Sequence, residues 1–209
     1  MTDLAATQTI DPEHGHLTST GVSNEKLAMW VFLASECLLF GGLISTFVLY
    51  RSKVLPSVPG GEALPLHESF DIPFTSVSSF VLLMSSMSMV LAVSAIQRGD
   101  HRGLRSWLAV TALLGTVFIS GQFYEFYEFV TVKGFGLTHS PAWSAFYVLT
   151  GFHGAHVTIG IVMLMGTFLL SLRGRIPQER AEAVEIVGLY WHFVDVVWII
   201  VFTVVYLIK

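Results

Sequence analysis

The sequence predicts an all-α, polytopic membrane protein with five transmembrane helices, and three observations support this. Of its 209 residues, 53% are hydrophobic and only 12% are charged, whereas about a quarter of the residues in a soluble domain are charged. Five separate stretches hold the roughly 20 apolar residues that a helix needs to cross a bilayer. The ten-residue alternation of apolar and polar side chains that is typical of a membrane β-barrel does not repeat along the chain.

The predicted spans are separated by short polar segments rich in glycine, proline and arginine. Residues 51–73 hold several prolines, and the segments 98–103 and 173–177 interrupt the later apolar runs. We therefore expect one membrane domain over residues 27–209, after a polar cytoplasmic tail over residues 1–26 that lacks the features of a secretory signal. The expected spans are Leu27–Tyr50, Phe74–Ile96, Trp107–Val132, Ala142–Ser171 and Val184–Ile208.

Lysine and arginine positions predict the orientation, because cytoplasmic loops carry an excess of both. Seven fall on the side of the N-terminal tail and four on the opposite side. This bias places the N-terminus in the cytoplasm and, after five crossings, the C-terminus outside. The first group is Lys26, Arg98, Arg102, Arg105, Arg173, Arg175 and Arg180, and the second is Arg51, Lys53, Lys133 and Lys209.

Composition and sequence pattern also argue against several classes of function. A net charge of −4 gives no reason to expect nucleic acid, which selects basic proteins. The single cysteine, Cys37, cannot form an internal disulfide. The absence of a sequence repeat weakens an inverted-repeat transporter reading, and His14 and His16 in the tail are too few ligands for a metal site.

Glu36 is the first ionisable residue that the apolar pattern places deep in the membrane, about ten residues into the first span. A charge at such a depth costs roughly 2.5–3.5 kcal/mol on insertion scales. Three interpretations remain open at this point. The residue can relay protons, anchor a bound lipid, or join two helices as a neutral glutamic acid.

Two further spans carry polar side chains spaced three residues apart, so that each pair shares a helix face. Gln122 and Glu125 lie in GQFYEFYEF, and His153 and His156 lie in TGFHGAHVTIG. Hydrogen bonds between helices are the simplest role for such groups. The two histidines are only half of a catalytic zinc site, which needs three protein ligands.

The fifth span repeats this spacing with His192 and Asp195, which can meet on one face of the helix. Trp191 and Trp198 are seven residues apart, about two turns, and flank the same stripe. Lipid tails offer no hydrogen-bond partners, so the stripe should face protein or headgroups. We interpret the pair first as a device that docks helices.

Several of these motifs, taken together and in this order, resemble subunit III of the haem–copper terminal oxidases. They are FLASECLLFGG, GQFYEFYE, TGFHGAHVTIG and YWHFVDVVWIIVFTVVYL. The resemblance covers four of the five spans. It implies a five-helix member of the family, which begins at the third helix of the seven-helix form.

The resemblance implies a subunit without a catalytic residue, metal or redox centre of its own, in a bacterial plasma membrane. Haem and copper would be held by partner subunits I and II of the complex. The fold it implies divides the helices into a two-helix and a three-helix group around a V-shaped cleft that holds structural phospholipids. Glu36 matches an acidic residue near this cleft that helps to sustain proton uptake by subunit I. The remaining matched positions, with an expected role in an inter-helix polar network, are Gln122, Glu125, His153, His156, His192 and Asp195.

The electron donor of the complex is less well determined by these motifs. TGFHG and the GQ that precedes YE favour the cytochrome c branch, whereas the EHGH tail and the ending FTVVYL resemble the quinol branch equally well. We favour cytochrome c. Two hypotheses from other functional classes remain open. One is an independent proton or ion transporter that uses Glu36, Glu125 and Asp195. The other is a membrane metalloenzyme that uses His153, His156 and His192.

Overall fold

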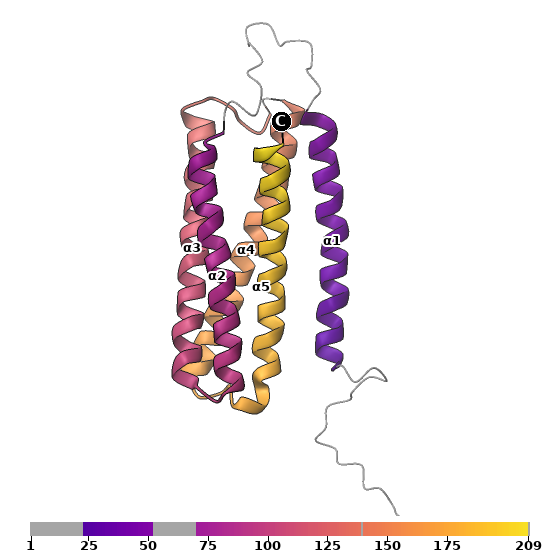
Figure 1. Cartoon of the computed structure of the whole chain (residues 1–209). Helices are drawn as coiled ribbons and strands as arrows, with labels where there is room; N and C mark the ends of the chain where they lie inside the picture. The colour runs from indigo at the N-terminus through magenta and orange to yellow at the C-terminus, as the bar shows by residue number, and fades with distance from the viewer. Residues whose placement is uncertain (1–22, 52–69, 139, 209) are drawn as a thin grey trace, which may run out of the picture.

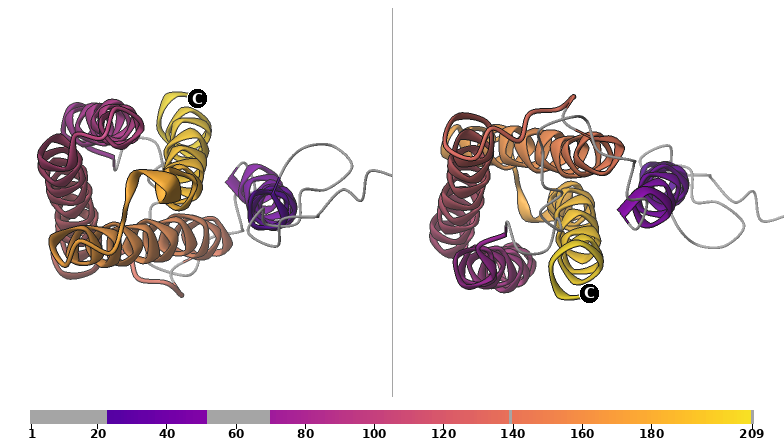
Figure 2. Two further views of the ribbon diagram at one scale, coloured as in Figure 1. Left: turned by 90° about the horizontal axis from the view of Figure 1, so that it is seen from below. Right: turned by 90° about the horizontal axis from the view of Figure 1, so that it is seen from above.

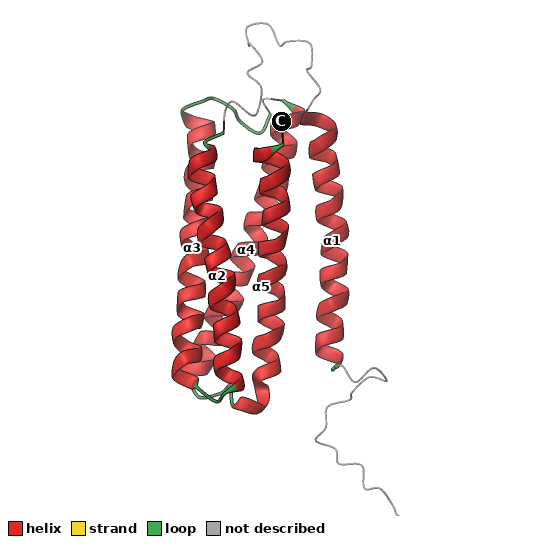
Figure 3. Ribbon diagram, viewed as in Figure 1, coloured by secondary structure: helices red, strands yellow, loops and turns green. Residues whose placement is uncertain are grey.

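The structure, a computed structural model, describes residues 23–51, 70–138 and 140–208. All regular structure in these ranges is helical (Figures 1 and 3), and five helices are long and apolar enough to cross a membrane. This confirms the predicted class. Most of the N-terminal tail and of the proline-rich loop lies outside the described residues. The helices are α1 (Asn24–Arg51), α2 (Ile72–Gln97), α3 (His101–Thr131), α4 (Pro141–Leu172) and α5 (Ala181–Phe202), with a 3-10 turn η2 (Gln178–Arg180) before α5 and a π-helical end η3 (Thr203–Leu207) after it.

Short polar side chains fix where three of the helices begin. Asp71 accepts a hydrogen bond from the backbone N–H of Phe74 at the start of α2, and Ser140 accepts one from Trp143 at the start of α4. Asp100 caps α3, which therefore begins at His101 rather than near Trp107. These caps satisfy backbone N–H groups that have no partner inside the helix.

Helices α2, α3, α4 and α5 form a four-helix bundle, in which each packs against the next and α5 returns to α2 (Figure 2). α1 lies outside this bundle, against α4 and α5. The expected division into two-helix and three-helix groups is therefore not the one observed. A turn of only three residues, 98–100, connects α2 to α3. Serine hydroxyls on α2 accept hydrogen bonds from the indole N–H groups of α5, and these bonds close the bundle.

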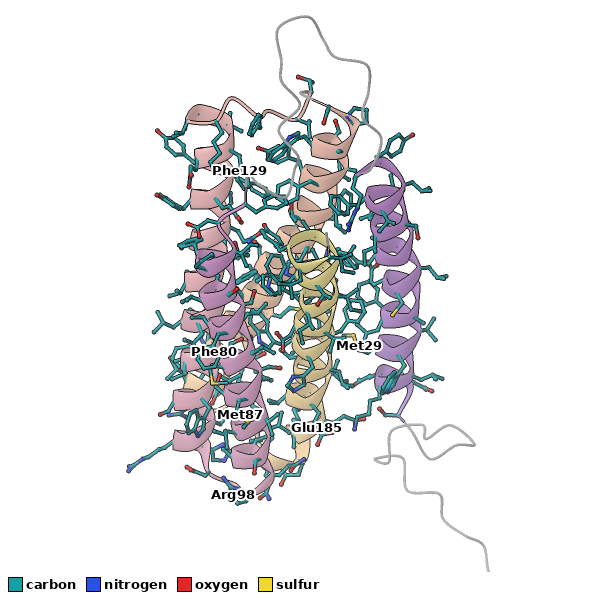
Figure 4. The ribbon with its side chains drawn as sticks, turned by 45° about the horizontal axis from the view of Figure 1, so that its top comes forward. Met29, Phe80, Met87, Arg98, Phe129 and Glu185 are labelled. Atoms are coloured by element: carbon teal, nitrogen blue, oxygen red, sulfur yellow. The ribbon has the colours of Figure 1, made fainter. Side chains whose placement is uncertain are left out.

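The contact of α1 with the bundle is a narrow seam. Its three buried residues, Leu33, Phe40 and Phe47, are spaced by seven, which is the repeat of a coiled-coil seam. Met29, partly buried, lies between α1 and α5 (Figure 4). The opposite face is open: the Leu38 side chain is 79% exposed. In a membrane protein such a face meets lipid or another subunit.

Trp191 of α5 fixes the closest approach inside the bundle. Its indole lies against Gly115 of α3 and Gly160 of α4, where an added Cβ atom would come within 2.5 Å and 2.8 Å of ring carbons. The indole N–H donates to the Ser85 hydroxyl of α2 at 3.1 Å. One side chain thus contacts all three neighbouring helices, and only glycine leaves room for it on α3 and α4.

Candidate functional site

The central contact between α1 and α4 joins Glu36 to His156. The Oε2 atom of Glu36 lies 3.1 Å from the Nε2 atom of His156, and the two side chains are only 15% and 13% exposed. The Phe40 ring meets the imidazole edge-on at 5.1 Å. The structure thus brings together two residues that sequence analysis assigned to separate roles, a lipid cleft and a polar network.

The hydrogen bonds of His156 determine how protons are shared at this contact. Its Nδ1 atom lies 2.8 Å from the carbonyl oxygen of Phe152. A carbonyl only accepts, so Nδ1 must carry a hydrogen. Nε2 then either accepts a hydrogen bond from a protonated Glu36 or donates one as part of an imidazolium. In both cases one proton lies between the two side chains and the pair is neutral overall.

Polar contacts also hold α1 at its two ends. Lys26 lies 2.7 Å from Glu185 of α5, a residue that Figure 4 places near the lower end of that helix. Ser23 donates to Glu182. At the other end, Arg51 donates to the carbonyl oxygen of Val204 at 3.1 Å. Lys26 and Arg51 were expected only to set the orientation, although their positions at the two ends of one span were a signal for such contacts.

Glu125 joins three segments at the end of the bundle where α5 passes into η3. Thr75 of α2 donates to its Oε1 atom and Tyr206 of η3 donates to its Oε2 atom, each at 3.0 Å. The Glu125 side chain is buried, and rings of Phe70 and Phe146 surround Tyr206. Each carboxyl oxygen therefore lies within hydrogen-bond distance of a hydroxyl from another segment rather than from the nearby Gln122. The Thr75 hydroxyl also lies 3.0 Å from the Asp71 carbonyl oxygen, so its single hydrogen is shared between two acceptors.

His192 and Asp195 face α2 rather than each other. The Nδ1 atom of His192 lies 2.6 Å from the hydroxyl of Ser86, which is also close to the Asp195 carboxyl. The Oδ1 atom of Asp195 has no hydrogen-bond partner among the described residues. The pair thus contacts a neighbouring helix, as expected, but through Ser86 and not through a bond between its own members.

His153 and Gln122 are buried without the expected inter-helix hydrogen bonds. The His153 ring stacks on Trp198 at 4.8 Å and meets Phe118 edge-on at 6.0 Å. Within the described part of the chain, neither His153 nitrogen has a hydrogen-bond partner, nor does the Gln122 Oε1 atom. Packing places these side chains, and the three atoms named here lack a partner among the described residues.

The three membrane histidines do not gather into a metal site. His153 packs among rings, His156 contacts Glu36, and His192 contacts Ser86. Across residues 23–51, 70–138 and 140–208, no three His, Cys, Asp or Glu side chains are placed so that they could hold a metal ion together. The described histidines therefore make contacts between helices or with aromatic rings and do not form a set of metal ligands.

Comparisons with known proteins agree on one family. The family model described as cytochrome c oxidase subunit III matches residues 1–209. The quinol oxidase subunit 3 of Bacillus subtilis is 40% identical over 182 residues, covering 87% of this chain and 85% of that protein. The cytochrome c oxidase subunit 3 of Synechocystis is 37% identical over 207 residues, covering 99% and 84%. That of Thermostichus vulcanus is 38% identical over 183 residues, covering 87% and 86%.

Proposed function

This chain belongs to the cytochrome c oxidase subunit III family, and we propose that it is a non-catalytic subunit of a proton-pumping haem–copper oxygen reductase in a bacterial plasma membrane. In this proposal subunits I and II hold the haems and the copper. The present chain stabilises subunit I and sustains its proton uptake during aerobic electron transport.

The contact between Glu36 and His156 is the observation on which this proposal most depends. An intramembrane acid that served as an ion-binding or catalytic group would need access to its substrate. Glu36 instead meets a histidine of the same chain, at the seam that holds α1 to the bundle. Glu125 and His192 likewise contact other helices of this chain. Polar groups used in this way support a structural role.

The outward face of α1 is where we place subunit I and bound phospholipid. Gly41 and Gly42 lie there, and an added Cβ atom at either would meet nothing within 4 Å. Small residues allow close approach of a second helix or an acyl chain. The exposed Cys37, one turn away, offers a position for a spin label. Its mobility should fall on assembly with subunit I, and an unchanged spectrum would place subunit I elsewhere.

We propose that the N-terminus lies in the cytoplasm and the C-terminus outside. The start of α1, the turn between α2 and α3, and η2 lie at one end of the molecule (Figure 1), and this end holds the larger group of arginines and lysines. A protease-cleavable tag after Lys209 should be cut in intact cells stripped of their outer layers. Cleavage only after lysis would reverse the orientation.

We favour cytochrome c over quinol as the electron donor, because TGFHG and the GQ before YE resemble that branch. Relatives named for each donor are similarly identical, at 37% and 40%, so quinol is the second candidate. Purification through a tag on this chain should recover subunits I and II with their haem and copper. Comparing oxygen uptake with reduced cytochrome c and with a quinol then identifies the donor.

The same preparation tests the proposal against a transporter. The isolated chain, reconstituted in liposomes, should carry no proton current. Current from the chain alone, or its purification without any haem-containing partner, would contradict the assignment to an oxidase.

A further inference from the structure

Three polar side chains in the interior of the bundle have buried atoms without a protein hydrogen-bond partner in the described part of the chain. They are Gln122 of α3, through Oε1, His153 of α4, through both ring nitrogens, and Asp195 of α5, through Oδ1. Their exposed fractions are 6%, 0% and 5%. Buried polar atoms are nearly always paired in proteins, so each of these needs a partner.

The three side chains lie at neighbouring levels of the bundle. The rings of Phe118 and Trp198 are 4.8 Å apart, and both contact the His153 ring. Gln122 follows Phe118 by four residues, and Asp195 precedes Trp198 by three. Because α3 and α5 run in the same direction (Figure 1), Gln122 lies about one turn beyond the His153 level and Asp195 about one turn before it, roughly 5.4 Å along the axis in each case. Each lies on the same side of its helix as the ring that contacts His153. Figure 2 shows α3, α4 and α5 enclosing this interior together with α2.

The two serine hydroxyls of α2 that lie beside the indoles at these levels are already committed. The Trp198 indole N–H donates to the Ser79 hydroxyl at 2.8 Å, and Ser79 donates to the Thr75 carbonyl at 2.7 Å. One level further in, the Trp191 indole donates to Ser85, and Ser85 donates to the Leu82 carbonyl at 2.6 Å. A serine hydroxyl has one hydrogen to give, so neither serine can supply the Gln122 or Asp195 oxygens.

The unpaired set therefore has more acceptors than donors. Gln122 Oε1 and Asp195 Oδ1 accept, and a neutral imidazole adds one acceptor and one donor. A water molecule donates two hydrogen bonds and accepts two, which makes it suited to such a deficit. Globular proteins hold about one buried water per 27 residues, usually at otherwise unsatisfied groups.

We propose that the α2–α5 bundle binds ordered water beside Gln122, His153 and Asp195, in the interior of this chain. These waters supply hydrogen-bond donors to the two oxygens and bond to the His153 nitrogens. The subunit then carries an internally hydrated column near the middle of its spans, between the Glu125 site and the packed Trp191 layer.

Hydroxyl-radical labelling of the intact oxidase, with X-ray radiolysis as the source, tests this directly, because radicals form from bound water inside a protein. Phe118 and Phe146 have the same chemistry and are both fully buried, but only Phe118 lies against the proposed waters. We expect several-fold more labelling at Phe118 than at Phe146. Equal, low labelling of both rings would overturn the proposal.

A His153→Phe variant gives the second comparison, since it keeps a ring to stack on Trp198 and removes both nitrogens. Labelling of Phe118 should fall in this variant, with Phe146 unchanged. If labelling of Phe118 stayed at its original level, the water would not be held by these groups and the proposal would be wrong. Should the variant fail to assemble, the comparison of the two rings in the unaltered chain still decides the question.

Discussion

Glu36 on α1 and His156 on α4 form a hydrogen bond across 120 residues of sequence, with 3.1 Å between Oε2 and Nε2. The carbonyl of Phe152 holds the hydrogen of Nδ1, so the shared proton lies between the two side chains. A neutral pair avoids most of the cost of placing a charge in the membrane. The pair therefore adds a specific contact to a seam whose buried residues are otherwise apolar.

Replacing Glu36 with alanine should weaken the attachment of α1 without touching any redox centre. The change leaves the Nε2 atom of His156 nearly buried and unpaired, which costs about 1–3 kcal/mol. We expect the initial rate of oxygen reduction to be largely retained and the number of turnovers before inactivation to fall. Both can be read from prolonged oxygen-uptake traces of the purified complex.

Cys37→Ser is the matched control for this variant. Cys37 is the next residue on α1 and is exposed, and serine keeps its size, so the replacement preserves the outward face of α1 and should leave the lifetime of the complex unchanged. Loss of haem or of all activity at once in Glu36→Ala would show that the residue does more than fasten a helix.

A glutamine at position 36 distinguishes the two positions of the shared proton. In one, a protonated Glu36 donates to a neutral His156; in the other, an imidazolium donates to the Glu36 carboxylate. The glutamine amide N–H can donate to Nε2 of a neutral His156, as a protonated carboxyl would, but an amide cannot balance an imidazolium. We expect Glu36→Gln to keep most of the working life that Glu36→Ala loses. A glutamine variant as short-lived as the alanine variant would indicate an ion pair instead.

Tyr206→Phe should destabilise the end of the bundle that holds Glu125 by about 1–3 kcal/mol, because it leaves the buried Oε2 atom of Glu125 without its donor. The midpoint of thermal unfolding of the complex measures this. Tyr127→Phe is the control: that ring is 65% exposed, and losing its hydroxyl should change little. Equal midpoints for the two variants would mean that the Glu125 contacts contribute nothing to stability.

The five spans could be predicted from sequence because the apolar length of a helix is a local property. The cost of burying Glu36, Glu125 and Asp195 is local too, and it correctly drew attention to them as residues in need of partners. Which atoms supply those partners is not local. Thr75 and Tyr206 lie 50 and 81 residues from Glu125, and no spacing rule connects them.

The spacing rule was less informative for His192 and Asp195. Residues three apart on a helix share a face, but the face looks toward α2, and Ser86 lies there with a hydroxyl already in reach. The grouping of the helices could not be predicted from the sequence either, because it depends on hydrogen bonds from the indoles of Trp191 and Trp198 to serine hydroxyls of α2.

Ser86→Ala should therefore lower the free energy of unfolding more than Met87→Ala, a substitution at its exposed neighbour on α2. The variant removes the hydroxyl that lies 2.6 Å from the Nδ1 atom of His192, and the partly buried ring is left without that partner. We expect a loss of about 1 kcal/mol, the net value of a typical hydrogen bond, in the free energy of unfolding. Met87→Ala, at a side chain that is 62% exposed, is the comparison and should cost less. A larger loss for Met87→Ala would contradict the assigned contact.

The indole of Trp191 makes the packing of α3, α4 and α5 sensitive to single methyl groups. Alanine at Gly115 or Gly160 would place its Cβ atom within 2.5 Å or 2.8 Å of ring carbons, so the indole must move. Inserting a methyl group into a packed core costs about 1–3 kcal/mol, and displacing the ring also strains its bond to Ser85.

Gly166→Ala is the matched control on α4, because its added Cβ atom meets nothing within 4 Å. Alanine favours a helix over glycine by up to about 1 kcal/mol, so this variant should be neutral or slightly stabilised. Thermal unfolding of the assembled complex should therefore rank Gly166→Ala above the unaltered chain or level with it, and both Gly115→Ala and Gly160→Ala below. If all three variants unfolded at the same temperature, the Trp191 indole would not determine how closely α3 and α4 approach α5.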